Sequence, residues 1–590
     1  MDKKTGNAFD FKLFKRLIAY TKPYKPIFYG VGVAAILLSS FAVARPYLLK
    51  ITVDDYILYK DNEGLLLFVG LMALLLLLEV LSQLGFIYFS NWLGQSIIRD
   101  IRIKLFRHML RFKMKYFDNS SVGILVTRSV NDMERIAEIF GQGFFMIVSD
   151  LLKMTVVAVV MLIFSWELAL IVFAVLPLIL YATRLFQKAM KLAFNEVRTQ
   201  VANLNSFVQE RITGMKIVQI FNREAIEYDK FREINRKHER AWIKTVWYNS
   251  IFFPVAELAS SLTIGLLVWY GGLRVIAPDS TMEIGTIFMF IQMSQMLFRP
   301  LRQIADKFNT LQMGMVAANR VFKILDTDSR IEDKGEKEAV TIEGHITFDN
   351  VYFGYTEEEE VIHGISFNAN AGETIAIVGA TGAGKSTIIN LLTRFYNINS
   401  GVIRIDGVDI QKFKLESLRS KIAVVLQDVF LFADTIHNNI TLRNPDISEQ
   451  EVINAAKAIG IHDFFMSLPG GYQYNVKERG TMLSSGQRQL IAFLRAYVSN
   501  PSILILDEAT SSVDAYAEQL IQQATDKITE GRTSIIIAHR LATVKKATRI
   551  LVMDAGKIVE TGTHEELLQK ENGYYKKLYE VQFMTREAIS

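Results

Sequence analysis

The chain has 590 residues, more than one ordinary domain holds, so two or more domains are expected. Hydrophobic residues make up 50% and charged residues 22%, and their uneven distribution favours a membrane-embedded half joined to a soluble half. The net charge is +5, and the excess of positive residues is concentrated beside apolar runs, which argues against nucleic-acid binding. The lack of cysteine excludes disulfides, thiolate metal sites and a cysteine nucleophile.

Six apolar stretches precede residue 311, each near the roughly 20 residues that a helix needs to cross a bilayer. Six in succession disfavour buried helices of a soluble protein. Ala42–Ala44 is similar to a signal-peptidase site, but the charged leader and the apolar run are too long for a usual signal peptide, so we expect an uncleaved first span. The predicted cores are Ile27–Lys50, Leu65–Phe89, Phe144–Phe164, Leu168–Thr183, Ile251–Val275 and Ile284–Met296, the last extending towards Asn309.

Two long polar segments separate the second stretch from the third and the fourth from the fifth. Like the N-terminal leader they are rich in lysine and arginine, whereas the short loops "YKDNE" and "APDSTME" are not. Because cytoplasmic segments carry the positive charge, we expect a multi-pass protein of the cell (inner or cytoplasmic) membrane with its N-terminus and both long segments inside. Residues 117–136 and 222–235 are candidates for the tips of these segments.

The sequence after the sixth stretch changes character. A polar, non-periodic run around 326–343 is typical of a linker, which predicts a membrane domain over 1–325 and a soluble domain over 344–590. In the soluble part, β-rich runs such as "HITFDNVYFGY", "ETIAIVG", "ILILDE" and "SIIIAH" alternate with helical patterns. This alternation predicts an α/β fold with a largely parallel sheet.

A phosphate-binding loop follows the run "ETIAIVG". Residues 379–386, "GATGAGKS", match GxxxxGK[ST] between a predicted strand and a helical pattern. Backbone N–H groups of such a loop surround phosphates, and the helix directs its positive end at them. We expect Lys385 to reach the β- and γ-phosphates and Ser386 to ligate Mg²⁺. The candidate contacts to a nucleotide are Gly379, Thr381, Gly382, Gly384, Lys385, Ser386 and Thr387.

Polar residues end three further predicted strands. "ILILDE" delivers Asp507 and Glu508 to the edge of the sheet, where Asp507 is expected to hold Mg²⁺ and Glu508 to polarise the attacking water. His539 ends "SIIIAH" and is a candidate to contact the γ-phosphate and hold that water, with a structural role as the alternative. Gln427 ends "IAVVLQ" and is placed to contact Mg²⁺ or water.

Together these motifs resemble those of the ATP-binding cassette (ABC) transporters, specifically exporters in which one membrane half is fused to one cassette. The likeness covers essentially the whole chain and rests on the phosphate loop, Gln427, "LSSGQ" at 483–487, "ILILDEATSSVD" at 503–514 and His539. It implies six transmembrane helices with long cytoplasmic extensions, an α/β P-loop NTPase cassette, and ATP and Mg²⁺ as cofactors. It also implies that the two candidate tips are coupling helices, which dock on the cassettes.

The resemblance assigns roles to further residues. Tyr355 matches the aromatic residue that stacks on adenine, with a core tyrosine as the alternative, and "KERG" at 477–480 matches a segment that contacts the coupling helices. Asp514 matches the loop that crosses between two cassettes. The "LSSGQ" residues match the helix start that faces the γ-phosphate held by a second cassette; they are Ser484, Ser485, Gly486 and Gln487.

A shared site of this kind implies a dimer with a second half-transporter. The usual family pattern is Leu-Ser-Gly-Gly-Gln, and Ser485 replaces its first glycine. The substitution fits a heterodimer with one weakened site and also a homodimer that tolerates serine; we favour the homodimer.

The predicted function is ATP-driven export of hydrophobic or amphipathic molecules, drug-like or lipid. One alternative is a lipid flippase, which differs in cargo and not in mechanism. The other is a non-transporting ATP-gated channel or regulator, and the intact Glu508 and His539 argue against this second alternative. Charged residues inside the spans, at Glu79, Asp150, Lys153 and Glu257, are candidates for function, although Asp150 and Lys153 could neutralise each other. Gln292, Gln295 and Arg299 share a helical face that either lines the cavity or packs against neighbours.

Overall fold

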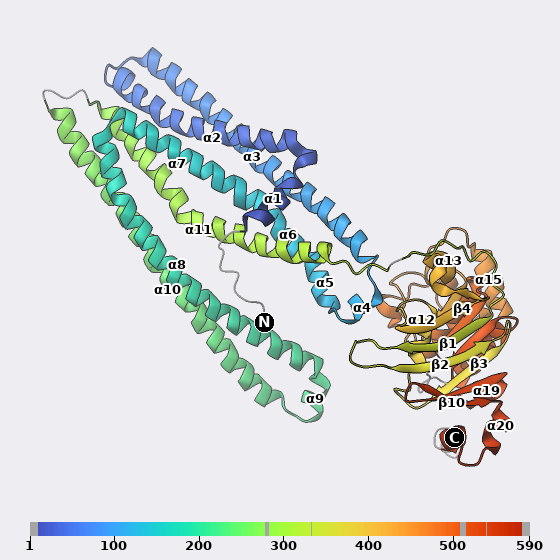
Figure 1. Ribbon diagram of the computed structural model, residues 1–590. Coiled ribbons are helices and arrows are strands. Elements are labelled where there is room, and N and C mark those ends of the chain that lie inside the picture. The colour runs from blue at the N-terminus through green and yellow to red at the C-terminus, as the bar shows by residue number, and fades with distance from the viewer. Residues whose placement is uncertain (1–9, 278–281, 332, 508–514, 539, 581–590) are drawn as a thin grey trace. The chain divides into compact units, whose positions relative to one another are not determined.

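The computed structural model describes residues 10–277, 282–331, 333–507, 515–538 and 540–580. The described residues fall into two compact units, one lying within 1–110 and 122–328 and the other within 111–121 and 329–590. The first unit consists of helices, and the second combines two sheets with shorter helices (Figure 1). The short segment 111–121 therefore belongs to the second unit although it lies between helices of the first.

Long helices dominate the first unit, and α8 and α10 run side by side in Figure 1. α3, α8 and α10 have 48, 48 and 53 residues, more than twice what a bilayer requires. The helices are α1 (Phe11–Ala19), α2 (Lys25–Ile51), α3 (Asn62–Met109), α5 (Val122–Ser129), α6 (Asn131–Glu138), α7 (Phe145–Phe164), α8 (Trp166–Thr213), α9 (Met215–Ile220), α10 (Glu224–Ile276) and α11 (Ile284–Asp326).

Within the described residues, five helical segments are long and apolar enough to cross a membrane, one fewer than predicted. They are Lys22–Ile57, Asn62–Met109, Val122–Phe164, Trp166–Thr213 and Glu224–Ile276. The sixth predicted stretch coincides with α11, which is 43 residues long but has its apolar run broken by charged residues such as Arg299 and Lys307.

The ends of the two long hairpins differ from the predicted tips. α8 ends at the C-cap residue Gly214, and α10 begins at Glu224, so the turn spans about ten residues that include α9. The predicted tip at 222–235 was wrong because its charged residues form the solvated first turns of α10. In the other hairpin, the short helix α4 (Met114–Asp118) begins before the predicted tip at 117–136.

Ion pairs join the membrane helices at the charged positions noted in the sequence. Asp150 on α7 pairs with Lys307 on α11, so its partner is not the expected Lys153. Arg45 on α2 lies 3.6 Å from Glu79 on α3. Each pair connects two helices, which reduces the cost of placing charge among apolar residues.

The second unit contains a six-stranded sheet in the order β10-β9-β3-β8-β7-β6. The five strands from β9 to β6 run parallel to one another, and only β10 is antiparallel to its neighbour β9. These strands are β3 (Thr374–Gly379), β6 (Ile422–Val425), β7 (Ile503–Asp507), β8 (Thr533–Ile537), β9 (Arg549–Asp554) and β10 (Lys557–Gly562). The predicted α/β fold with a largely parallel sheet is confirmed.

A second, antiparallel sheet has the order β2-β1-β4-β5. The run "HITFDNVYFGY" supplies β1, so it does not join the parallel sheet. Its strands are β1 (Ile346–Phe353), β2 (Ile362–Ala369), β4 (Ser400–Ile405) and β5 (Val408–Asp409). The helices around both sheets are α12 (Lys385–Leu392), α13 (Leu415–Arg419), α14 (Ile436–Thr441), α15 (Glu449–Ala458), α16 (His462–Met466), α17 (Ser485–Val498), α18 (Ala515–Thr529), α19 (Leu541–Lys546), α20 (His564–Gln569) and α21 (Tyr574–Tyr579).

Candidate functional site

The loop between β3 and α12 has backbone geometry that its glycines permit. A Cβ on Gly379 would lie 2.2 Å from the carbonyl oxygen of Met553, a distance that no side chain tolerates. Gly382 and Gly384 have φ angles of +86° and +93°, in the left-handed region that favours glycine. The loop thus curls tightly before α12 and leads into the N-terminal end of that helix, where a phosphate is stabilised.

Lys385 lies folded into this loop. Its Nζ donates hydrogen bonds to the carbonyl oxygens of Gly379 and Ala380, both at 2.8 Å. Burial lowers the pKa of Lys385, and the nearby Asp507 carboxylate acts in the opposite direction. Phosphate oxygens are stronger acceptors for an ammonium group than these carbonyls. A bound phosphate could therefore replace the two carbonyl oxygens as the hydrogen-bond acceptor of Lys385 Nζ.

The predicted metal ligands come together at the carboxyl edge of the parallel sheet. Ser386 Oγ donates to Asp507 Oδ2 at 3.5 Å, and Gln427 lines the same cavity. Hydroxyl, carboxylate and amide oxygens are the hard donors that Mg²⁺ prefers, so the residues present fit this ion.

A cavity of about 420 Å³ unites most of the predicted nucleotide contacts. Val361 and Ile537 also line it, and neither was predicted. Ile537 ends β8, two residues before His539, so the strand-end argument could have found it; Val361 carries no chemical signal. The predicted residues at this cavity are Thr381, Gly382, Gly384, Lys385, Ser386, Thr387, Gln427 and Asp507. Three other predicted residues, Glu508, Asp514 and His539, lie outside the described residues.

Tyr355 lies beside α12 and is not among the residues that line this cavity. Its hydroxyl accepts a hydrogen bond from Asn390 Nδ2 at 3.0 Å and lies 3.3 Å from Thr387 Oγ1. Asn390 was not predicted, although its position one turn after Thr387 places both on one helix face. These two contacts fix Tyr355 relative to the helix that starts at the phosphate loop.

The "LSSGQ" segment forms the start of α17. Gln487 N donates to Ser484 Oγ at 3.2 Å, and Ser484 N donates to Gln487 Oε1 at 3.0 Å, which is a capping box. Ser484 and Ser485 are exposed, whereas Gly486 is buried. Among the described residues that line the phosphate cavity, none comes from this segment.

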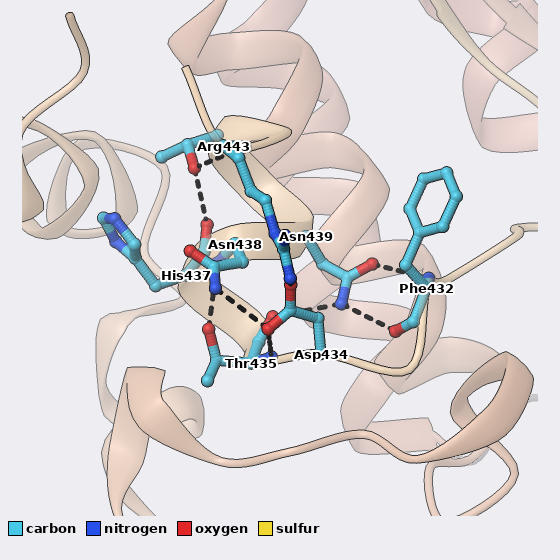
Figure 2. A network of polar contacts seen from close by, with 8 residues as sticks. Phe432, Asp434, Thr435, His437, Asn438, Asn439 and Arg443 are labelled. Atoms are coloured by element: carbon cyan, nitrogen blue, oxygen red, sulfur yellow. Dashed lines mark hydrogen bonds and ion pairs between the residues drawn. The ribbon is translucent and has the colours of Figure 1, made fainter. Parts of the chain in front are cut away.

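A network of polar contacts links residues between Phe432 and Arg443, in the part of the chain that follows Gln427 (Figure 2). Asn439, which is fully buried, receives a hydrogen bond from Phe432 N at 2.8 Å and donates to Phe432 O at 3.0 Å. Arg495 on α17 donates to Asn439 O at 2.8 Å. The segment that follows Gln427 is therefore tied to the helix that carries "LSSGQ".

Asp434 is the charged centre of the same network (Figure 2). Its carboxylate accepts hydrogen bonds from Asn438 Nδ2, Thr435 N and Arg443 Nε at 2.9, 2.8 and 2.8 Å. These contacts, led by that of Asn438, lower the pKa of Asp434 to about 2. The carboxylate is thus ionised throughout the physiological range.

Two families of known proteins match the chain. The family described as ABC transporter transmembrane region matches residues 28–301, and the family described as ABC transporter matches residues 362–511. The first match lies among the membrane helices, and the second contains the phosphate loop and Asp507.

Similar proteins match over almost the full length. An ATP-dependent lipid A-core flippase of Syntrophus aciditrophicus (strain SB) is 36% identical over 97% of this chain and 94% of its own length. A putative multidrug export ATP-binding/permease protein of Bacillus subtilis (strain 168) is 35% identical over 97% of this chain and 99% of its own. Among solved structures, a bacterial Atm1-family ABC exporter with ATP bound is similar with a TM-score of 0.73 and 28% identity, over 95% of this chain and 98% of that one.

Proposed function

This chain belongs to the ABC transporter family, as its motifs predicted, and from that membership we propose that it couples ATP hydrolysis to the export of amphipathic molecules, drug-like or lipid, across a membrane. The observation that carries the proposal is the phosphate cavity, where Lys385, Ser386 and Asp507 meet in a chain that also has long apolar helices.

ATP and Mg²⁺ are the proposed ligands of the cavity. Ser386, Asp507 and Gln427 would hold the ion, which when bound neutralises charge on the phosphates. Lys385 exchanges its loop carbonyls for phosphate oxygens. Glu508 takes the proton of the attacking water, and His539 orients that water towards the γ-phosphate.

The proposed partner is a second half-transporter, and we favour a second copy of this chain. The exposed start of α17 supports this proposal because Ser484 and Ser485 present a helix N-terminus that does not line this chain's own cavity. In a dimer, each "LSSGQ" segment would face the γ-phosphate held by the partner. Asp514 would lie at the crossing between the two cassettes.

The turn around α9 is a second proposed contact with the cassettes. Ile217, Ile220 and Phe221 are 57%, 60% and 67% exposed at the turn between α8 and α10. Exposed apolar residues at such a tip favour a docking role, which is the role proposed for a coupling helix. With these tips in the cytoplasm, the protein would lie in the inner or cytoplasmic membrane with its N-terminus inside.

A lipid is the narrower alternative for the cargo. The charged pairs Asp150–Lys307 and Arg45–Glu79 provide polar groups among apolar helices, which suits a molecule with both a headgroup and a tail. Translocation of fluorescent lipids and of drug-like dyes into proteoliposomes distinguishes the two cargo classes.

Replacing the proposed base tests the function. In the purified full chain, Glu508→Gln should bind ATP with unchanged affinity and lose nearly all phosphate release, because the water has no base. Gln450→Glu on the exposed face of α15 is a control that should retain full activity. Undiminished phosphate release by Glu508→Gln would remove Glu508 from the mechanism, and a wild-type chain that neither binds nor hydrolyses ATP would overturn the proposed function.

A further inference from the structure

A cavity of about 450 Å³ lies between the beginning of α8 and the end of α10, the two helices that run side by side in Figure 1. The volume is typical of a site for one small molecule. Val175 of α8 and Leu266 of α10 are among its apolar walls. Trp166, Leu170 and Trp269 also line it and are exposed, so the cavity opens at the surface of the helix pair.

The cavity has the depth of one membrane leaflet. Its α8 residues run from Trp166 to Val175, about 14 Å along the helix at about 1.5 Å per residue. The hydrocarbon core of a bilayer is about 30 Å thick. Because α8 begins at Trp166 and α10 ends at Ile276, one end of the cavity lies where these helices meet the membrane surface, and tryptophan is enriched at that level. The cavity therefore extends from the membrane surface towards the middle of the bilayer.

Three polar side chains gather at the surface end of the cavity. The Glu167 carboxylate accepts hydrogen bonds from the Arg274 guanidinium and, at 3.2 Å, from the Tyr270 hydroxyl. Arg274 Nε donates to the same hydroxyl at 3.2 Å. In the described part of the chain, these bonds use two of the five N–H donors of the guanidinium, and the Arg274 side chain is 43% exposed. The group thus has no net charge, and it keeps donors that can reach a phosphate.

We propose that this cavity binds a phospholipid whose headgroup carries both a phosphate and an ammonium group, such as phosphatidylethanolamine. An acyl chain lies along the apolar walls, the phosphate accepts from Arg274, and the ammonium lies near Glu167 and the face of an indole ring. A headgroup with no net charge fits the neutral ion pair, whereas an anionic headgroup brings a second negative charge to Glu167 without an added cation. The site is independent of the cargo and of ATP, and it requires only that α8 and α10 cross a membrane.

Tryptophan quenching tests the headgroup preference. A full chain with Trp92, Trp242 and Trp247 replaced by phenylalanine keeps only Trp166 and Trp269, both at the cavity. It is reconstituted in equal mixtures of phosphatidylethanolamine and phosphatidylglycerol, with dibrominated acyl chains on one lipid or the other. Because bromine quenches only a tryptophan that it approaches, the two signals give the ratio of the binding constants. We expect about fivefold in favour of phosphatidylethanolamine, less than a buried charge-assisted hydrogen bond contributes, since Arg274 is partly exposed.

Charge variants in the same chain test the role of the ion pair. Glu167→Gln keeps an acceptor oxygen but leaves a net positive charge, so the preference should change to phosphatidylglycerol. Arg274→Gln should bring the ratio close to one, whereas Arg274→Lys, which keeps the charge, should largely retain the preference. Glu196→Gln is the matched control, because it removes an ion pair with Lys244 that joins the same two helices at 2.8 Å, and it should leave the fivefold ratio unchanged.

Three results overturn the inference. Equal quenching by the two lipids in the starting chain would show that the tryptophans only face bulk lipid. Absence of quenching by either lipid would show that a second copy of the chain or another protein segment covers the cavity. A Glu167→Gln chain that still prefers phosphatidylethanolamine would remove the ion pair from headgroup recognition. The proposed function is tested separately, by phosphate release, and none of these results decides it.

Discussion

Asn439→Leu should destabilise the cassette, because the Asn439 side chain is the hydrogen-bond partner of both the backbone N–H and the backbone C=O of Phe432. The leucine has nearly the same volume but cannot accept from Phe432 N or donate to Phe432 O. Thr435 O keeps a partner, since the backbone N–H of residue 439 also donates to it at 3.0 Å. Two backbone groups thus lose their hydrogen-bond partners, at a cost of about 1–3 kcal/mol each. We expect a total towards the low end, about 3 kcal/mol, because the Phe432 side chain is exposed and water reaches part of the segment.

The expected change is a fall in the melting temperature of the cassette of about 6–12 °C, from about 2–4 °C per kcal/mol in a domain of this size. All 5 tryptophans precede residue 277, so tryptophan fluorescence reports on the helical unit and not on the cassette. Calorimetry of the full chain is therefore required. The cassette transition is the one that ADP shifts upward.

The matched control is Asn454→Leu on α15, where the side chain is exposed and its hydrogen bond is to Gln450 on the same helix. Its melting temperature should change by less than about 2 °C, since surface substitutions cost within about 0.5 kcal/mol. If Asn439→Leu shifts the transition no more than this control, the network in Figure 2 does not stabilise the segment after Gln427.

Three other predictions concern single side chains. The pKa of Asp434 is lowered to about 2, so its ionised form contributes stability that is complete above about pH 4 and is lost as the pH falls through 2. In calorimetry, Asp434→Asn should therefore melt at a lower temperature than the wild type at about pH 7. This difference in melting temperature should narrow towards about pH 2. An unchanged gap would contradict the assignment. Tyr355→Ala should raise the KM for ATP several-fold in steady-state ATPase assays, and an unchanged KM would make Tyr355 a core residue only. Ser485→Gly should raise ATPase activity where the residue lies in a working shared site, and an unaltered rate in a demonstrated homodimer would make the serine neutral.

Local patterns in the sequence were sufficient for much of the fold and for the strand–loop–helix element of the phosphate loop. The phosphate loop depends on a few adjacent residues, from Gly379 to Ser386, whose conformations follow from glycine geometry and a helix start. The strand that ends at Asp507 could be predicted because its apolar residues are consecutive and the carboxyl ends of parallel strands share one edge. The resemblance to ABC exporters likewise implied the long extensions that α8 and α10 form.

Contacts between distant segments were decided only by the tertiary structure. Asp150 has Lys153 one turn away, yet it pairs with Lys307, because helix packing brings α11 to that face of α7. No spacing in the sequence relates Tyr396 to Asp118, 278 positions away, yet the Tyr396 hydroxyl donates a hydrogen bond to the Asp118 carboxylate. The sequence by itself therefore determined the elements and the chemistry of the phosphate site, whose rules act over a few residues. The tertiary structure decided which side chains meet across elements, because packing of apolar faces, and not residue order, sets those distances.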